Sequence, residues 1–272
     1  MADFQTKLKQ AEKYKMHGQL KKAISIYQEI LNENPAEIDV IYNLAELHYL
    51  LGDLKDSIKF YQQVIEMEPK YSLAFYKLGI CYFRYTDFQK AIECFNEIST
   101  NEPDLYMAHY WKGLSYYHRG NIDAAINSFK ELHKHSRNST LGYYQMSISL
   151  KAAGRFKEAV KLLEEIVKQD DKAVAVQYHL GLAYLGLKQI EKALECFERV
   201  LVLNPEHKGA QAEVDLLVTD QEMLYSYGVS SHKKEASLDE LTSNFHVGQT
   251  YRGMAMIEDA MKYFRKKTEK KE

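Results

Sequence analysis

The sequence predicts an all-α protein, an α-solenoid of stacked antiparallel helix pairs. The four prolines, Pro35, Pro69, Pro103 and Pro205, are separated by 34, 34 and 102 residues, all multiples of 34. Within each period, apolar residues recur at helical spacing in two runs. Residues of similar size also return at fixed positions of this period. A period of this length is typical of repeat architectures, in which each unit buries its apolar face only against its neighbours.

A 34-residue frame that begins at residue 4 gives six consecutive repeats without an insertion. The repeats are 4–37, 38–71, 72–105, 106–139, 140–173 and 174–207. Frame position 8 is always small: Ala11, Ala45, Gly79, Gly113, Ser147 and Gly181. Position 20 is also small: Ala23, Ser57, Ala91, Ala125, Ala159 and Ala193. Position 24 is large: Tyr27, Tyr61, Phe95, Phe129, Leu163 and Phe197.

This arrangement has a physical reason. Small residues at positions 8 and 20 allow two antiparallel helices to approach closely, and large residues beside them fill the remaining space. Glycines at position 15 predict the turn between the helices: Gly18, Gly52, Gly120 and Gly154. Proline at position 32 ends the second helix because it cannot continue the helical hydrogen bonds.

At these residues the sequence resembles the tetratricopeptide repeat (TPR) family, over 4–207 without a break. The resemblance implies a right-handed superhelix. Its concave surface would be formed mainly by the first helix of each repeat, at frame positions 2, 5, 6, 9, 12 and 13. The resemblance also implies a non-enzymatic scaffold or adaptor that binds other proteins.

The repeat pattern is interrupted after residue 207. Apolar residues at helical spacing, such as Ala210, Val214 and Leu217, predict a capping helix over 208–227. We expect a flexible polar loop at 228–237, followed by a seventh TPR-like helical hairpin with a basic tail at 238–272. Three arrangements of this hairpin remain open: stacking on the capping helix, exchange with a second molecule, or folding back over the groove.

The predicted groove carries tyrosine at position 5 of five repeats, and we call this set the tyrosine ladder: Tyr42, Tyr76, Tyr110, Tyr144 and Tyr178. The only tryptophan, Trp111, occupies position 6 of repeat four. Exposed aromatic side chains in a concave surface are frequent anchors of binding sites. We therefore expect a groove for an apolar or amphipathic peptide or helix of a partner, engaged most strongly at repeats three to five. The alternative is that the ladder mostly packs as scaffold. The other candidate groove residues are Asn43, Lys77, Ile80, Leu114, Tyr117, Gln145, Ile148 and Leu182.

One known type of TPR groove is not predicted. Chaperone-binding TPR domains hold a terminal carboxylate with a two-carboxylate clamp of Lys and Asn residues. Only Asn43 and Lys77 match that pattern, and Glu12 would repel an acidic peptide end. We therefore do not expect a clamp-type chaperone partner.

Charge and composition bear on location and partners. The net charge is −2 and the pI about 6.6, so no basic field attracts nucleic acid, and an RNA-binding helical repeat is the less favoured alternative. No stretch approaches the roughly 18 apolar residues of a membrane span, and the N-terminus lacks the apolar core of a signal peptide. The three cysteines, Cys81, Cys94 and Cys196, lack paired spacing. We expect a cytoplasmic protein without membrane insertion, with Cys81 as a packed small hydrophobe.

No catalytic motif is recognisable, so we expect no enzyme activity, no cofactor and no metal. The histidines at 133–135 are expected in a solvated polar turn between repeats. A second hypothesis for function is a self-assembling oligomeric scaffold, in which the C-terminal hairpin completes a neighbouring molecule.

Overall fold

The computed structural model describes residues 2–101, 105–136 and 140–226, and this part of the chain contains thirteen α-helices. It divides into two compact units, Met1–Ala153 and Gly154–Glu272, which are described separately. The predicted loop at 228–237 and the predicted seventh hairpin at 238–272 lie outside the described residues.

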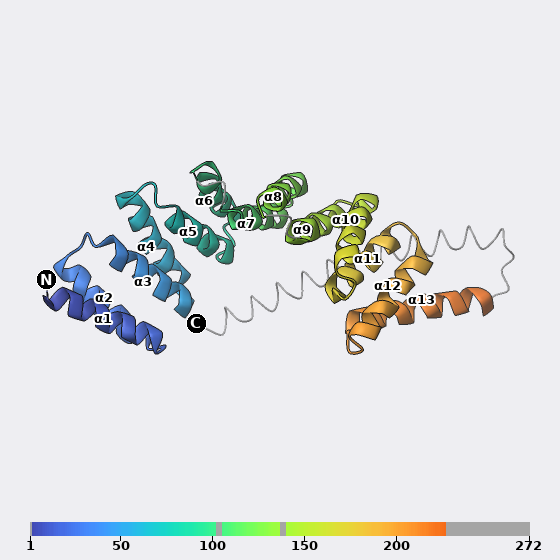
Figure 1. The fold of residues 1–272 in the computed structure, drawn as a ribbon, viewed down its shortest axis with the longest axis horizontal. Coiled ribbons are helices and arrows are strands. Elements are labelled where there is room, and N and C mark those ends of the chain that lie inside the picture. The colour runs from blue at the N-terminus through green and yellow to red at the C-terminus, as the bar shows by residue number, and fades with distance from the viewer. Residues whose placement is uncertain (1, 102–104, 137–139, 227–272) are drawn as a thin grey trace. The chain divides into compact units, whose positions relative to one another are not determined.

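The described residues of the first unit form nine consecutive helices (Figure 1). They are α1 (Ala2–Met16), α2 (Leu20–Glu33), α3 (Ile38–Leu51), α4 (Leu54–Met67), α5 (Ser72–Arg84), α6 (Phe88–Asn101), α7 (Met107–His118), α8 (Ile122–His135) and α9 (Thr140–Ala152). Each helix packs against the next one along the chain, and α5 also contacts α7. The odd-numbered helices are therefore the first helices of the predicted repeats, and the even-numbered ones are the second helices.

The second unit begins at Gly154, between the two helices of the predicted fifth repeat. Its helices are α10 (Phe156–Gln169), α11 (Val174–Gly186), α12 (Ile190–Leu203) and α13 (Lys208–Ser226). Here too, each helix packs against the next. The prediction of an all-α solenoid of packed helix pairs is confirmed.

The frame positions have the packing roles that their sizes indicate. All six residues at position 20 are 0% exposed. At position 8, a Cβ atom added to Gly113 would lie 2.5 Å from the ring of Phe129, so only glycine permits this close approach. The same pairing joins Gly79 to Phe95 and Gly181 to Phe197. The position-24 ring thus lies against the first helix of its own repeat, in the space that the small residue leaves.

Position 15 has a left-handed backbone in all six predicted repeats. Four of these residues are the glycines expected in the turn, with φ between 71° and 87°. The other two are Thr86 (φ 65°) and Lys188 (φ 60°). The turn geometry is therefore kept even where the sequence lacks the glycine that favours it.

The three cysteines are free and buried. Cys81 is 0% exposed, which confirms its expected role as a packed small side chain, and its Sγ atom lies 3.3 Å from Ser57 Oγ. Burial raises the pKa of Cys94 to about 12 and that of Cys196 to about 11. These thiols are thus held in the unreactive neutral form.

Candidate functional site

The candidate site is the surface that the first helices of the first unit present. We call it the first-helix face and define it by frame positions 2, 5, 6, 9, 12 and 13 of α1, α3, α5, α7 and α9. Side chains at these positions reach one another between neighbouring helices. Lys15 of α1 contacts Glu46 of α3, which contacts Lys77 of α5, and Trp111 of α7 contacts Tyr76 of α5. The frame therefore brings these positions onto one surface.

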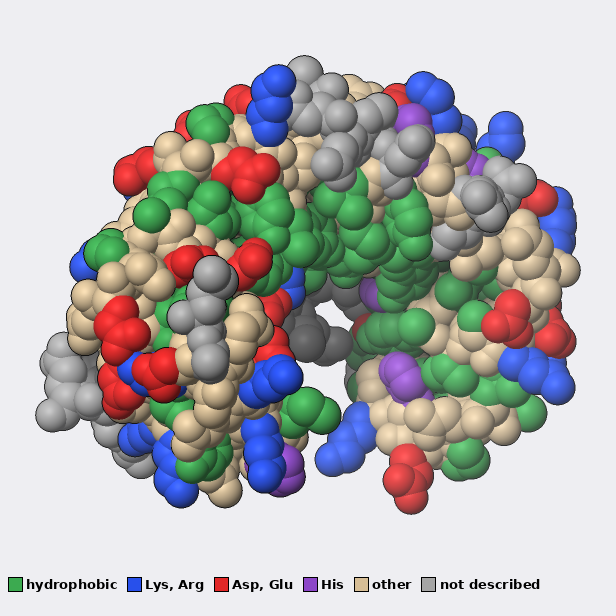
Figure 2. Space-filling model, turned by 60° about the vertical axis from the view of Figure 1, so that its left-hand side comes forward, with side chains coloured by type: hydrophobic (Ala, Val, Ile, Leu, Met, Phe, Trp, Pro, Cys, Tyr) green, Lys and Arg blue, Asp and Glu red, His purple; other side chains and the backbone are tan. Residues whose placement is uncertain are grey.

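The predicted groove residues of the first unit share one level of burial. All are half-buried, neither enclosed in the core nor fully exposed. They are Tyr42, Asn43, Tyr76, Lys77, Ile80, Tyr110, Trp111, Leu114, Tyr117, Tyr144, Gln145 and Ile148. Each aromatic ring among them therefore gives part of its surface to packing and leaves part accessible. Figure 2 shows a group of hydrophobic side chains on the face in view, bordered by areas with more charged side chains.

The tyrosine ladder contacts the core through the ring at position 24 of the same repeat. The ring centroids of Tyr42 and Tyr61 are 5.5 Å apart in an edge-to-face arrangement. Tyr76 and Phe95 are also edge-to-face, at 6.3 Å, and the rings of Tyr110 and Phe129 are tilted towards each other at 6.5 Å. The close approach at position 8 allows this contact because it brings the position-24 ring up to the first helix. Tyr42, Tyr76 and Tyr110 are thus partly scaffold.

An aromatic cluster joins α5 to α7, and we define it by Tyr76, Phe83, Tyr110 and Trp111. The Trp111 indole Nε1 donates a hydrogen bond of 3.1 Å to the Tyr76 hydroxyl. The Trp111 ring lies edge-to-face against Phe83 at 5.2 Å and against Tyr110 at 5.4 Å. Such pairs stabilise an arrangement beyond the area that they bury. The cluster is consequently a fixed, half-buried aromatic surface, with Leu114 on the next turn of α7.

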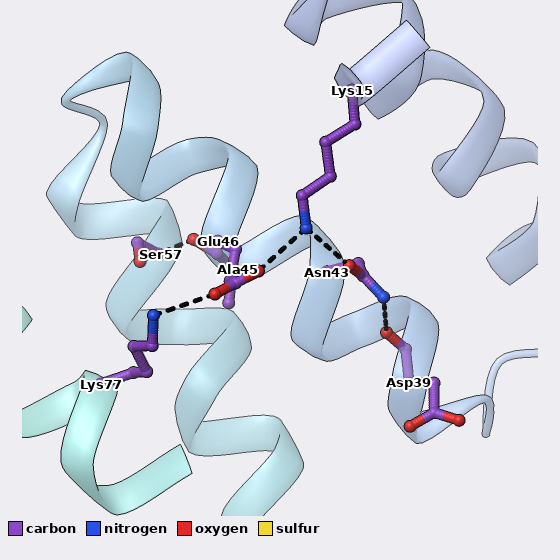
Figure 3. A network of polar contacts seen from close by, with 7 residues as sticks. All are labelled: Lys15, Asp39, Asn43, Ala45, Glu46, Ser57 and Lys77. Atoms are coloured by element: carbon purple, nitrogen blue, oxygen red, sulfur yellow. Dashed lines mark hydrogen bonds and ion pairs between the residues drawn. The ribbon is translucent and has the colours of Figure 1, made fainter. Parts of the chain in front are cut away.

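A polar network joins α1, α3 and α5 on the same face (Figure 3). We call it the lysine–glutamate network and define it by Lys15, Asn43, Glu46 and Lys77. Lys15 Nζ donates to Glu46 Oε2 at 2.9 Å and to Asn43 Oδ1 at 3.0 Å. Lys77 Nζ donates to Glu46 Oε1 at 3.0 Å. Asn43 Nδ2 in turn donates to the backbone oxygen of Asp39 at 2.8 Å, so the carboxylate and the amide are held from both sides.

Glu46 carries the negative charge of this network. Partial burial alone would raise the pKa of its carboxyl, but the hydrogen bonds from Lys15 and Lys77 outweigh it and lower the pKa below the ordinary value. Glu46 is therefore ionised at neutral pH. Asn43 and Lys77, the two residues that match the clamp pattern, both take part in this internal network.

The remaining candidates lie further along the chain. Tyr144, Gln145 and Ile148 are half-buried on α9, the last first helix of this unit, and burial raises the pKa of Tyr144. Tyr178 and Leu182 belong to α11 in the second unit, where both are half-buried. The Tyr178 ring contacts Phe197 at 5.7 Å and His207 at 4.8 Å. Tyr178 is thus packed between α12 and the segment that leads into α13.

The histidines at 133–135 do not lie in a turn, so that expectation was wrong. They form the last turn of α8, which ends at His135. The His133 ring stacks on Tyr143 of α9 at 3.8 Å, and His135 stacks on His109 of α7 at 5.5 Å. Both histidines therefore take part in helix packing. Across the described residues, no group of His, Cys, Asp and Glu side chains has an arrangement suited to a metal ion.

Lys15 is a functional residue that the sequence did not lead us to expect. It holds the polar network together with Glu46, whereas Glu46 and Phe83 were expected on the groove as neighbours of the selected residues. The signal for Lys15 was present, because it occupies position 12, as Phe83 does, and this position belongs to the implied concave surface.

The fold and this face define a class: a helical repeat protein in which equivalent positions of successive first helices form one surface. Family models described as tetratricopeptide repeat match residues 16–65, 42–104, 76–136, 142–173 and 174–207, and together they cover more than half of the chain. The chain belongs to the TPR family, whose members generally act as protein-interaction scaffolds.

Solved structures share this fold. One is a TPR protein from Parabacteroides merdae, 17% identical, with a TM-score of 0.66, covering 89% of this chain and all (100%) of that one. Another is PilW, a type IV pilus biogenesis factor, 14% identical, with a TM-score of 0.62 and coverage of 78% and 98%. A third is YrrB, described as a TPR protein with an unusual peptide-binding site, 20% identical, with a TM-score of 0.58 and coverage of 68% and 96%. Comparison with proteins of curated function gives no match. Within the described residues, no helix has both the length and the apolar character to cross a membrane.

Proposed function

We propose that this protein is a non-enzymatic scaffold or adaptor that binds an apolar or amphipathic peptide or helix of a partner protein. The binding surface is the first-helix face, and binding is strongest at α5, α7 and α9. No cofactor or metal is required. The buried free cysteines agree with a reducing, cytoplasmic location, which is part of the proposal.

The aromatic cluster is the observation that carries this proposal. Its rings are fixed by mutual contacts and by the Trp111–Tyr76 hydrogen bond, so a partner would find them already ordered. Binding to such a surface costs little side-chain entropy. Large aromatic side chains are also the residue types that contribute most to binding energy in interfaces. The peptide-binding site described for YrrB, a protein of the same fold, gives further support.

Affinity capture with matched variants tests the proposal. A Leu114→Ala, Tyr117→Ala double variant removes two half-buried side chains from the face beside the cluster. An Ile58→Ala, Ile65→Ala variant removes two half-buried side chains from the second helix α4 and controls for general destabilisation. We expect the first variant to lose the captured partners and the second to keep them, with equal helicity by circular dichroism. Equal capture by both variants would contradict the proposal.

The alternative is self-assembly through the predicted C-terminal hairpin. The mass of the full-length protein in solution, compared with that of a 1–227 truncation, separates the two hypotheses. Masses that are monomeric for both chains exclude self-assembly, whereas a larger mass that is lost on truncation favours it. RNA binding is the less favoured reading because Glu12, Asp39 and Glu46 add carboxylates to the face.

A further inference from the structure

The charges of the first-helix face are unevenly distributed along the first unit. Its carboxylates occur only on α1 and α3, at Glu12, Asp39 and Glu46. The face positions of α5, α7 and α9 contain no Asp or Glu at all. Their titratable side chains, tyrosine apart, are Lys77, Arg84, His118 and Lys151. The part of the face that includes the aromatic cluster therefore presents basic groups alone.

These basic groups differ in whether they are charged and whether they already form an ion pair. Lys77 is bound to Glu46 at 3.0 Å. Burial lowers the pKa of Lys151 to about 8, so its positive charge is disfavoured where it lies. Arg84 is exposed and permanently charged. In the part of the chain that the structure describes, Arg84 forms no ion pair, and its guanidinium lies 4.6 Å from the centroid of the Tyr49 ring.

Arg84 follows Phe83 of the aromatic cluster along α5, and its guanidinium lies against the Tyr49 ring of α3. The Phe83 ring contacts Trp111 at 5.2 Å and the exposed His118 at 5.5 Å. The cation–π contact with the Tyr49 ring holds the Arg84 guanidinium at this place on the face. A guanidinium held beside apolar rings forms its strongest contacts with carboxylates, which it can bind through two hydrogen bonds. Next to Phe83 along α5, Arg84 thus offers a positioned cation that forms no ion pair within the described residues.

We infer that the segment bound at α5, α7 and α9 is an acidic amphipathic one, whose carboxylates lie beside its apolar residues and pair with Arg84. This inference rests on the proposed function and specifies its partner. The apolar residues contact the aromatic cluster, and the carboxylate binds at its edge. A basic segment with the same apolar residues binds less well, because the face positions of α5, α7 and α9 offer it no carboxylate.

The charge of the whole chain does not explain such a preference. The net charge is −2, so the long-range field slightly opposes an acidic ligand. A preference for the acidic segment must therefore come from the local arrangement around the cluster. It should weaken as salt screens the contact.

Two synthetic peptides test the inference on the full-length protein. Each is an amphipathic helix of about five turns with the same Leu and Phe face. One has Glu on its polar face and the other has Lys. Both are acetylated and amidated, so that no terminal carboxylate contributes. By titration calorimetry at low salt, we expect the Glu peptide to bind about tenfold more tightly, and this ratio should fall in 0.5 M salt (roughly a 4 Å screening length).

Two variants that each remove one positive charge test whether the preference for the Glu peptide depends on Arg84. Arg84→Gln removes the cation at the cluster, and Lys130→Gln removes an exposed cation from the second helix α8. We expect Arg84→Gln to weaken Glu-peptide binding about fivefold and to leave the Lys peptide unchanged or slightly better. Lys130→Gln should alter neither.

The possible failures are distinct. If neither peptide binds, the proposed apolar binding surface itself is wrong, because both peptides carry the same apolar face. If both bind equally, the surface stands but the acidic preference is overturned. If the Glu peptide is preferred and Arg84→Gln has no more effect than Lys130→Gln, the assignment to Arg84 is overturned.

Discussion

The lysine–glutamate network and the aromatic cluster lie on the same first-helix face but differ in chemistry. Position 6 is Asn43 in repeat two and Trp111 in repeat four. Position 9 changes from Glu46 to Leu114 in the same way. In the network, Lys15 and Lys77 satisfy Glu46 by ionic contacts, whereas in the cluster the side chains of α5 and α7 pack as rings. The same repeat fold thus carries two kinds of surface. In the lysine–glutamate network, the Glu46 carboxylate is already paired within the protein, whereas the aromatic cluster is available to an apolar ligand.

The same contrast extends into the core. Position 24 is tyrosine in repeats one and two and phenylalanine in repeats three and four. Among the described residues, the buried hydroxyls of Tyr27 and Tyr61 have no hydrogen-bond partner. Burial raises the pKa of Tyr27 to about 12. Polar groups are therefore placed in the first two repeats at positions where the next two repeats have only carbon.

The largest expected difference between the aromatic cluster and the lysine–glutamate network is in the affinity for the Glu peptide. Trp111→Ala should weaken binding of the Glu peptide by about 2 to 4 kcal/mol, because it removes the central ring of the cluster and the bond to Tyr76. Lys15→Ala, in the lysine–glutamate network, should change it less than about twofold. Titration calorimetry measures both, with circular dichroism to verify folding. Equal losses would show that binding is not localised at the cluster.

Lys151, a lysine of the first-helix face on α9, sharpens the comparison through the pH dependence of stability. Burial lowers the pKa of Lys151 to about 8 in the folded protein, below about 10.4 in the unfolded chain. Between these values the unfolded state binds more protons, so stability rises with pH. The free energy of unfolding of the wild type should rise by up to about 3 kcal/mol relative to Lys151→Met as pH increases from 7.5 to 10.5. Denaturant titrations check this, with Lys130→Met as the exposed control.

Exchanging tyrosine and phenylalanine at position 24 should change stability in opposite directions in repeats two and three. Tyr61→Phe should raise the free energy of unfolding by about 1 kcal/mol, because a buried polar group without a partner is removed. Phe95→Tyr, at the same position of repeat three, should lower it. Denaturation midpoints of the two variants provide the measurement. A loss of stability in Tyr61→Phe would mean that its hydroxyl has a stabilising partner.

An effect of similarly small size is expected in the lysine–glutamate network. Glu46→Gln should lower the free energy of unfolding by about 1 kcal/mol at neutral pH, because the two lysines lose their shared carboxylate. The folded pKa of Glu46 is lowered, so this contribution is complete above its unfolded pKa and disappears as pH falls through the folded value. Glu97→Gln, exposed on α6, is the control. Unfolding curves at pH 7 and pH 3 that show the same difference would contradict this account.

The sequence was sufficient to predict the helices and much of the core packing. Position 8 must be small because the ring at position 24 fills the space beside it, as Gly113 and Phe129 show. The sequence was not sufficient to predict the left-handed backbone at Thr86, because glycine is the residue that indicates such a turn and this repeat lacks it. The contact partners of long side chains could not be predicted either. The frame gives the position of Lys15, but its choice of Glu46 as partner depends on side-chain rotamers and on neighbours in the next repeat.

The central claim is that the aromatic cluster is the binding surface, and the single tryptophan allows a direct test. Acrylamide quenching of Trp111 emission should be measured in the free protein and with saturating Glu peptide, which contains no tryptophan. A half-buried Trp111 should be partly quenched when free and clearly protected when the peptide is bound. Saturation confirmed by calorimetry with no change in quenching would place the peptide elsewhere and contradict the claim.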